Sequence, residues 1–160
     1  MSVSVGAVSE TRPPVSVGPV REEVLGVAAL PSAVPVARYF GRALLGSWGV
    51  DEARRRAAQQ VLSELAGNAL EATGELGGTG IEVRGIGMML VRFRLCAAHL
   101  VVEVRDDSAA LPRAGRTGLL DEGGRGLMLA ESLASCWGLY TLAAGKVVWA
   151  AWGGEGARFR

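Results

Sequence analysis

Apolar residues recur at helical spacing in the stretch from residue 61 to residue 73, which reads V-L-S-E-L-A-G-N-A-L-E-A-T. The residues at this spacing predict a helix that buries one face, and they are Val61, Leu62, Leu65, Ala69 and Leu70. Glu64 and Asn68 are four residues apart, so they stack on another face of the same helix. Two interpretations stay open for this face: a solvated surface, or an acid and an amide that serve as a base and a metal ligand.

A shorter amphipathic helix is predicted before this one. Its apolar residues follow one another at i, i+4 spacing, and they are Val36, Phe40, Leu44 and Trp48. Ser32 is the predicted N-cap, and the helix is expected to end near Gly49. A first strand is predicted at Glu22–Leu30, and Asp51 is the predicted cap of the longer helix.

Alternation between an apolar face and a mostly charged face predicts two strands joined by a turn at Ala97-Ala98. The apolar faces are Met89, Val91, Phe93 and Leu95, followed by Leu100, Val102 and Val104. Asp106 is in phase with the second set, so its carboxylate is expected to point toward the buried side, whereas Asp107 points away. A buried carboxylate is costly unless it is hydrogen bonded. Asp106 is therefore either a cap at the strand end or a recognition group that accepts hydrogen bonds from the N–H groups of a ligand.

The stretch from 109 to 124 is long for a connection in a compact domain. It leads into Gly123-Gly124-Arg125-Gly126-Leu127, just before an apolar helical run. Glycines ahead of a helix let backbone N–H groups approach an anion. The helix is predicted to end at Trp137-Gly138. A last hairpin is predicted around Ala144-Gly145-Lys146, with strands at Leu139–Leu142 and Val147–Trp152.

Composition limits the function classes. A chain of 160 residues with 49% apolar residues, 21% charged residues and a net charge of +1 is an ordinary globular sequence. Residues 1–20 are predicted to be a disordered tail and residues 21–160 a single domain. The charge gives no case for binding nucleic acid or an anionic membrane.

Without a membrane span or a signal peptide, and with Cys96 and Cys136 far apart, a cytoplasmic protein with reduced thiols is expected. The sole histidine, His99, is interpreted as a structural strand residue.

Four stretches, in this order and spacing, resemble the GHKL ATPase superfamily, whose nucleotide pocket is the Bergerat fold. They are L-S-E-L-A-G-N-A-L-E-A-T at 62–73, V-E-V-R-D-D-S-A-A-L-P at 102–112, E-G-G-R-G-L-M-L-A-E-S-L-A-S-C-W-G-L at 122–139 and G-K-V-V-W-A at 145–150. More narrowly, the chain resembles the small anti-sigma-factor serine/threonine kinases of actinobacteria. The resemblance implies an α+β fold: a two-layer α/β sandwich with a mixed, mostly antiparallel sheet and helices on one face.

The resemblance also implies roles for single residues. Asn68 would coordinate the Mg²⁺ that bridges the ATP phosphates, and Glu64 would position or deprotonate the attacking hydroxyl. Asp106 would bind the adenine amino group. The backbone at Gly124, Arg125, Gly126 and Leu127 would follow the phosphates, and residues 109–123 would form a lid. The implied partners are a sigma factor, a small antagonist protein that is phosphorylated, and a second copy of the chain.

Two departures from the family pattern keep an alternative function open. Asp106 is followed by Asp107-Ser108-Ala109-Ala110, where the family has D-x-G-x-G, and Val147 stands where many relatives have a threonine. The alternative is a nucleotide-sensing or degenerate interaction module without kinase activity. An unrelated metabolic α+β enzyme is a third hypothesis, although the sequence offers no Cys/His catalytic pair.

Overall fold

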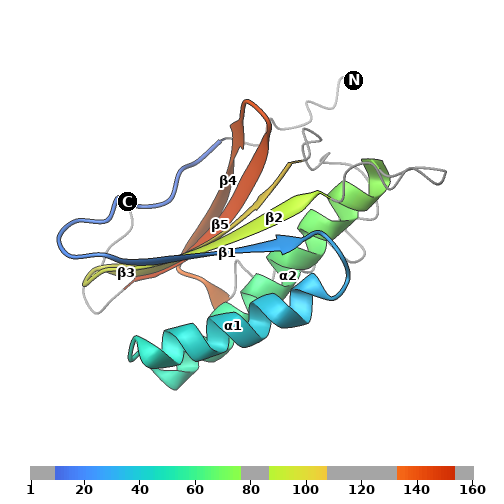
Figure 1. The fold of residues 1–160 in the computed structure, drawn as a ribbon. Helices are drawn as coiled ribbons and strands as arrows, with labels where there is room; N and C mark the ends of the chain where they lie inside the picture. The colour runs from blue at the N-terminus through green and yellow to red at the C-terminus, as the bar shows by residue number, and fades with distance from the viewer. Residues whose placement is uncertain (1–9, 77–86, 108–132, 154–160) are drawn as a thin grey trace, which may run out of the picture.

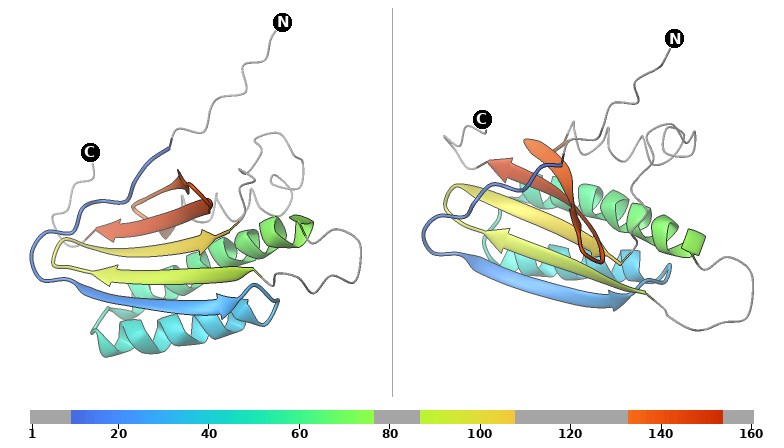
Figure 2. Two further views of the ribbon diagram at one scale, coloured as in Figure 1. Left: turned by 45° about the horizontal axis from the view of Figure 1, so that its top comes forward. Right: turned by 90° about the horizontal axis from the view of Figure 1, so that it is seen from above.

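The computed structural model describes residues 10–76, 87–107 and 133–153. Its elements are β1 (Arg21–Ala28), α1 (Ala33–Ser47), α2 (Glu52–Leu76), β2 (Met88–Leu95), β3 (His99–Asp106), β4 (Cys136–Leu142) and β5 (Gly145–Gly153). The strands form one sheet in the order β1-β2-β3-β5-β4, and both helices cover the same face of it (Figure 1). Figure 2 shows the two layers from other directions.

The expected two-layer α+β architecture is confirmed. All four strand pairings in the described part of the chain are antiparallel, so the parallel pair of a mixed sheet is not found among these strands. The predicted strand at 22–30 is β1, and Ala97-Ala98 forms the turn between β2 and β3. Below, the face covered by the helices is called the inner face, and the opposite face is called the outer face.

The ends of the two helices follow from local chemistry. The backbone N–H of Arg54 donates to Asp51 Oδ1 at 2.9 Å, which is the expected N-cap bond of α2. Gly49 has a φ of +74°, and beside it the N–H of Val50 donates to the carbonyl of Leu45 at 3.0 Å, so α1 ends in a glycine cap as expected. Ser32 occupies the N-cap position of α1, but its side chain makes no capping hydrogen bond.

The buried stripe of α1 differs from the prediction. Its fully buried residues are Ala33, Ala37, Gly41 and Leu45, whereas Val36 is 49% exposed and Phe40, Leu44 and Trp48 pack only partly against the core. The hydrophobic spacing predicted that the large side chains are buried. In the structure, α1 packs so closely on the sheet and on α2 that mainly small residues fit at the contact. A Cβ atom at Gly41 would lie only 3.0 Å from Phe93 Cζ and 3.2 Å from Leu62 Cδ2.

We predict that Gly41→Leu lowers the free energy of unfolding by about 1–3 kcal/mol, because the added side chain has to displace a well-packed ring. The matched control is Gly46→Leu on the same helix, where an added Cβ meets only the end of the Arg55 side chain. This control should be neutral or stabilising, because leucine is a better helix former than glycine. Urea unfolding of both variants tests the prediction, and equal stability of the two would contradict it.

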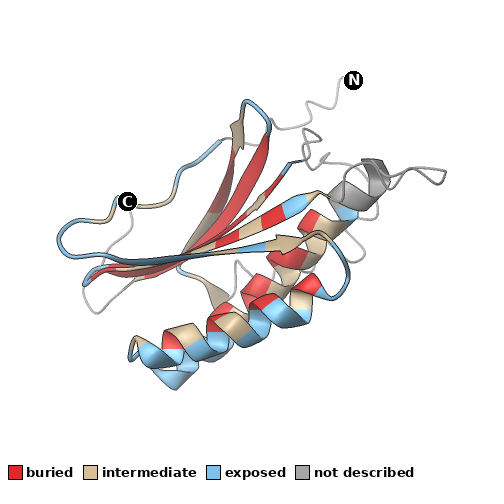
Figure 3. Cartoon of the chain, in the orientation of Figure 1, coloured by how far each residue is buried: buried red, intermediate tan, exposed pale blue. Residues whose placement is uncertain are grey.

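The core lies between the helices and the inner face of the sheet (Figure 3). Val61, Leu62, Leu65 and Ala69 of α2 are buried as predicted, while Leu70 is half-buried. The facing strand positions are also buried as their alternation predicts, and they are Met89, Val91, Phe93, Leu100, Val102 and Val104. This core fixes α2 against β3, which is the arrangement that positions the candidate site.

The outer face carries a smaller apolar cluster made of Val101, Tyr140, Val147, Trp149 and Ala151. The segment before β1 runs over this cluster. The N–H of Thr11 donates to the carbonyl of Leu139 at 2.9 Å, and Trp149 Nε1 donates to the carbonyl of Thr11 at 2.8 Å. The described part of the predicted N-terminal tail therefore contacts the sheet, and the domain boundary at residue 20 stays a prediction.

The prediction that a third helix ends at Trp137-Gly138 is wrong. Trp137 and Gly138 lie in β4, which begins at Cys136. Gly138 is needed there for close packing, because a Cβ atom would overlap the side chain of Thr11 and lie 2.8 Å from Trp149 Cζ2. Both cysteines are free thiols, as expected. No helix in the described ranges is long and apolar enough to cross a membrane.

His99 at the start of β3 provides a pH-dependent prediction. Burial lowers the pKa of His99 below its ordinary value of 6.5, and the positive charge of Arg94 lowers it further. As the pH falls, the unfolded chain therefore binds this proton before the native chain does, so acidification below about pH 6.5 favours unfolding. We expect the urea midpoint to fall between about pH 7.5 and about pH 5.5, and to fall less in His99→Gln. An identical pH dependence in the variant would contradict this.

Candidate functional site

Asp106 ends the central strand β3 on the inner face, where the alternation predicted it. Only 1% of the residue is exposed, and it is one of the largest fully buried side chains in the described part of the chain. The burial of an ionisable group at this depth requires strong compensation. The expectation that the carboxylate of Asp106 points to the buried side of the sheet is therefore confirmed.

The compensating charge is Lys146, which the sequence did not identify as a site residue. Lys146 Nζ lies 3.1 Å from Asp106 Oδ2 and donates to Oδ1 at 3.2 Å. The two residues are direct partners in the antiparallel pairing of β3 with β5, so both side chains project from the same face of the sheet. A signal was present in the sequence: Lys146 is the only lysine among seventeen basic residues.

Gly145 allows the two strands to approach at this point. Its φ is +111°, and a Cβ atom would overlap the backbone carbonyl oxygen of Asp106. Only glycine avoids both the strained conformation and the clash. The chemical identity of residue 145 therefore sets the register that places Lys146 opposite Asp106.

Val147 does not occupy a position from which a hydroxyl could contact the adenine end of the site, so the expected effect of the missing threonine is wrong. The turn between β4 and β5 falls at Ala143-Ala144, and β5 begins at Gly145 rather than at Val147. Lys146 points to the inner face together with its partner Asp106, so the next residue, Val147, points to the outer face. There Val147 packs in the cluster with Tyr140 and Trp149. A hydroxyl at position 147 could not have contacted Asp106, so the missing threonine removes no partner from this carboxylate.

Glu64 and Asn68 lie half-buried on α2, beside its buried stripe. Near the start of α2, Arg54 Nη2 donates to the carbonyl of Gly153 at 2.6 Å, and Gly153 is the register partner of His99. From this anchor, fourteen helical residues to Asn68 span about 21 Å, and seven strand residues from His99 to Asp106 span about 23 Å.

Asn68 in the C-terminal half of α2 and Asp106 at the C-terminal end of β3 therefore lie toward the same end of the molecule. Figure 2 agrees, since the C-terminal end of β3 and the C-terminal half of α2 lie at the same end of the fold. Both residues belong to the side of the sheet that carries the helices. The structure thus places the half of α2 that carries the amide and the end of β3 that carries the acid at the same end of the fold.

The remaining predicted site residues lie outside the described residues. These are Gly124, Arg125, Gly126 and Leu127, together with the lid at 109–123. In the described ranges no group of three or more His, Cys, Asp and Glu side chains could hold a metal ion by itself. Mg²⁺ prefers oxygen donors and is usually held by few protein ligands together with substrate phosphates, and the side-chain amide oxygen of Asn68 is a donor of this kind.

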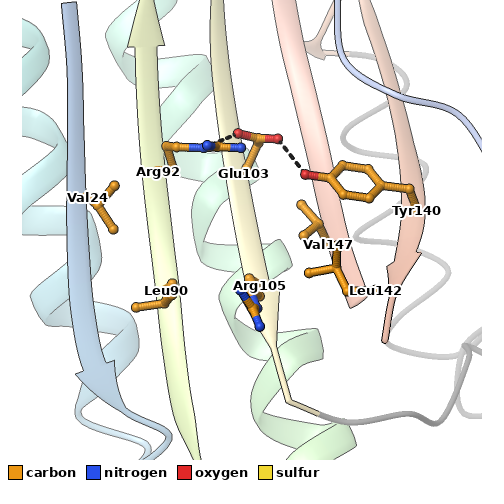
Figure 4. Close-up of a pocket in the computed structure, with 8 residues that line it drawn as sticks. All are labelled: Val24, Leu90, Arg92, Glu103, Arg105, Tyr140, Leu142 and Val147. Atoms are coloured by element: carbon orange, nitrogen blue, oxygen red, sulfur yellow. Dashed lines mark hydrogen bonds and ion pairs between the residues drawn. The ribbon is translucent and has the colours of Figure 1, made fainter. Parts of the chain in front are cut away.

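The outer face has a pocket of its own, with a volume of about 250 Å³ (Figure 4). One of its lining residues is the buried Glu103, which accepts hydrogen bonds from Arg92 Nε at 2.5 Å and from the Tyr140 hydroxyl at 3.2 Å. The hydrogen bond to Glu103 raises the pKa of Arg92, while burial and then the charge of Glu103 raise the pKa of Tyr140. These groups satisfy one another, and their position on the outer face separates them from Asp106.

The comparisons with known proteins agree with this arrangement. No curated protein matches the chain. A protein family described as "Histidine kinase-like ATPase domain" matches residues 27–152, which is most of the chain and includes Glu64, Asn68, Asp106 and Lys146. The match excludes an unrelated metabolic enzyme. The chain belongs to the histidine kinase-like ATPase (GHKL) family, whose domain implies ATP binding.

Proposed function

We propose that the chain is an ATP-dependent serine/threonine protein kinase of the anti-sigma-factor type. It would hold a sigma factor inactive, phosphorylate a small antagonist protein, and act as a homodimer in the cytoplasm. Two observations support this best: the chain belongs to the histidine kinase-like ATPase family, and the buried Asp106 ends β3 at the end of the fold where the C-terminal half of α2, which carries Asn68, also lies. A purine would bind at the acid, and the phosphates would lie toward the amide.

Each residue has a defined task in this proposal. Asp106 accepts a hydrogen bond from the amino group of adenine, and Asn68 supplies an oxygen ligand to Mg²⁺. When bound, Mg²⁺ neutralises charge that develops on the phosphates. Glu64, one turn before Asn68, orients the attacking hydroxyl of the substrate and accepts its proton. Phosphoryl transfer depends mainly on such positioning and charge stabilisation.

We predict that Asp106→Asn weakens ATP binding by about 10- to 100-fold, because a hydrogen bond to a charged group contributes roughly 1.5–3 kcal/mol. Isothermal titration calorimetry with and without Mg²⁺ measures the effect. The matched control is Asp107→Asn, which changes an exposed neighbour and should leave the affinity unchanged. Wild-type protein that binds no ATP would exclude both the kinase and the nucleotide sensor.

We also predict that Glu64→Ala lowers the rate of phosphate transfer by about 10²- to 10⁴-fold, the usual contribution of a general base. Affinity for ATP should change little, because the carboxylate acts on the acceptor hydroxyl. Transfer from radiolabelled ATP to an antagonist-like protein encoded next to this gene provides the assay. The control is Glu71→Ala, an exposed acid on the same helix. Loss of ATP binding in Glu64→Ala would show that the role of Glu64 is wrong.

A nucleotide sensor without kinase activity is the second candidate function. Two observations favour it: Ser108 and Ala110 stand where the family pattern has glycines, and the Asp106 carboxylate already has a cationic partner. The two functions separate in the same assays. A kinase binds ATP and transfers phosphate, whereas a sensor binds ATP and leaves every candidate antagonist unmodified.

A further inference from the structure

The only lysine of the chain is buried, although lysine is normally the most exposed of the residues. The side chains of Lys146 and Asp106 are 6% and 2% exposed. Burying two charges costs several kcal/mol per ion, and their mutual attraction rarely exceeds this cost. The ion pair is therefore expected to add little to the free energy of unfolding, and stability alone does not explain its presence.

The pair presents an acceptor and a donor side by side at the inner face. Lys146 Nζ lies within 3.2 Å of both carboxylate oxygens, and the two side chains come from directly paired strand positions. A carboxylate has about four lone-pair sites and an ammonium has three N–H donors, which is more than the contact between the two side chains uses. It is complementary to a ligand edge on which a donor and an acceptor are adjacent.

Adenine has such an edge, with the 6-amino group as donor and ring nitrogen N1 as the neighbouring acceptor. Proteins that recognise single bases commonly bind this Watson–Crick edge. Asp106 alone could contact only the amino group. With Lys146 beside it, the site can contact both atoms in one closed ring of hydrogen bonds.

We propose that Lys146 is a specificity-determining residue, which donates a hydrogen bond to N1 of adenine while Asp106 accepts one from the 6-amino group. This inference rests on the proposed binding of ATP at Asp106. The ion pair is retained in the complex rather than broken. Val147 has no part in base recognition, because it lies on the outer face.

The first test uses the unmodified protein and three nucleotides in calorimetry: ATP, 1-deaza-ATP and purine riboside triphosphate. The second nucleotide lacks the N1 acceptor, and the third lacks the amino donor. We expect each analogue to bind about 10- to 100-fold more weakly than ATP, because each loses one hydrogen bond to a charged group. This comparison does not depend on the folding of any variant.

The second test is Lys146→Met, which removes the donor and keeps a similar length. This variant should bind ATP and 1-deaza-ATP with equal, reduced affinity, while it still discriminates against the nucleotide without the amino group. Val147→Thr is the control on the adjacent, outward-facing position, and it should keep the wild-type preferences. If Lys146→Met fails to fold, Asp106→Asn combined with Lys146→Met removes both buried charges and should bind ATP and 1-deaza-ATP equally.

Three results would overturn the proposal. Equal binding of ATP and 1-deaza-ATP by the wild type would remove the role of Lys146 and leave the ATP-binding function intact. Tighter binding of ATP by Lys146→Met would show that the lysine obstructs the base instead of contacting it. Binding of no nucleotide at all would reject the proposed function, and the role of Lys146 with it.

Discussion

The central strand β3 is buried on both faces and carries a carboxylate toward each of them. Asp106 points to the inner face and Glu103 to the outer face, and both residues are at most 2% exposed. A buried carboxylate has to be compensated by its neighbours, so the strands beside β3 must supply cations in register. Lys146 of β5 meets this requirement on one face, and Arg92 of β2 meets it on the other. The two strands that flank β3 therefore have to be strands that carry a cation opposite each of its acids.

The two compensated acids differ in their chemical possibilities. Glu103 is held by Arg92, Arg94 and Tyr140, so its hydrogen-bonding capacity is used within the protein. Its position under the N-terminal segment suits a structural role. Asp106 lies at a strand end, at the end of the fold that also holds the C-terminal half of α2. Membership in the histidine kinase-like ATPase family implies that the chain binds ATP, and our proposal places the nucleotide at this end.

Much of this arrangement could be predicted from the sequence, because alternation and helical spacing report burial directly. The phase of β3 placed Asp106 correctly, and Asp51 and Gly49 marked helix ends through their own side-chain or backbone chemistry. The stripe of α1 was placed on the wrong side chains, because close packing favours Ala37 and Gly41 and carries no hydrophobic signal. Lys146 was missed because the predicted turn at Ala144-Gly145-Lys146 included it, whereas the strand begins at Gly145 and Lys146 is already a paired strand residue.

The presence of a single lysine has a practical consequence for experiments in solution. Lys146 carries the only ε-amino group of the chain, and it is shielded from solvent by its packing next to the carboxylate. Reagents that modify amines reach this nitrogen only when the groups packed around it move apart, and a nucleotide that contacts Lys146 requires the same opening, so the rate of modification measures the free energy of that local event. Reductive methylation with labelled formaldehyde would introduce one side-chain NMR reporter, located at the centre of the site.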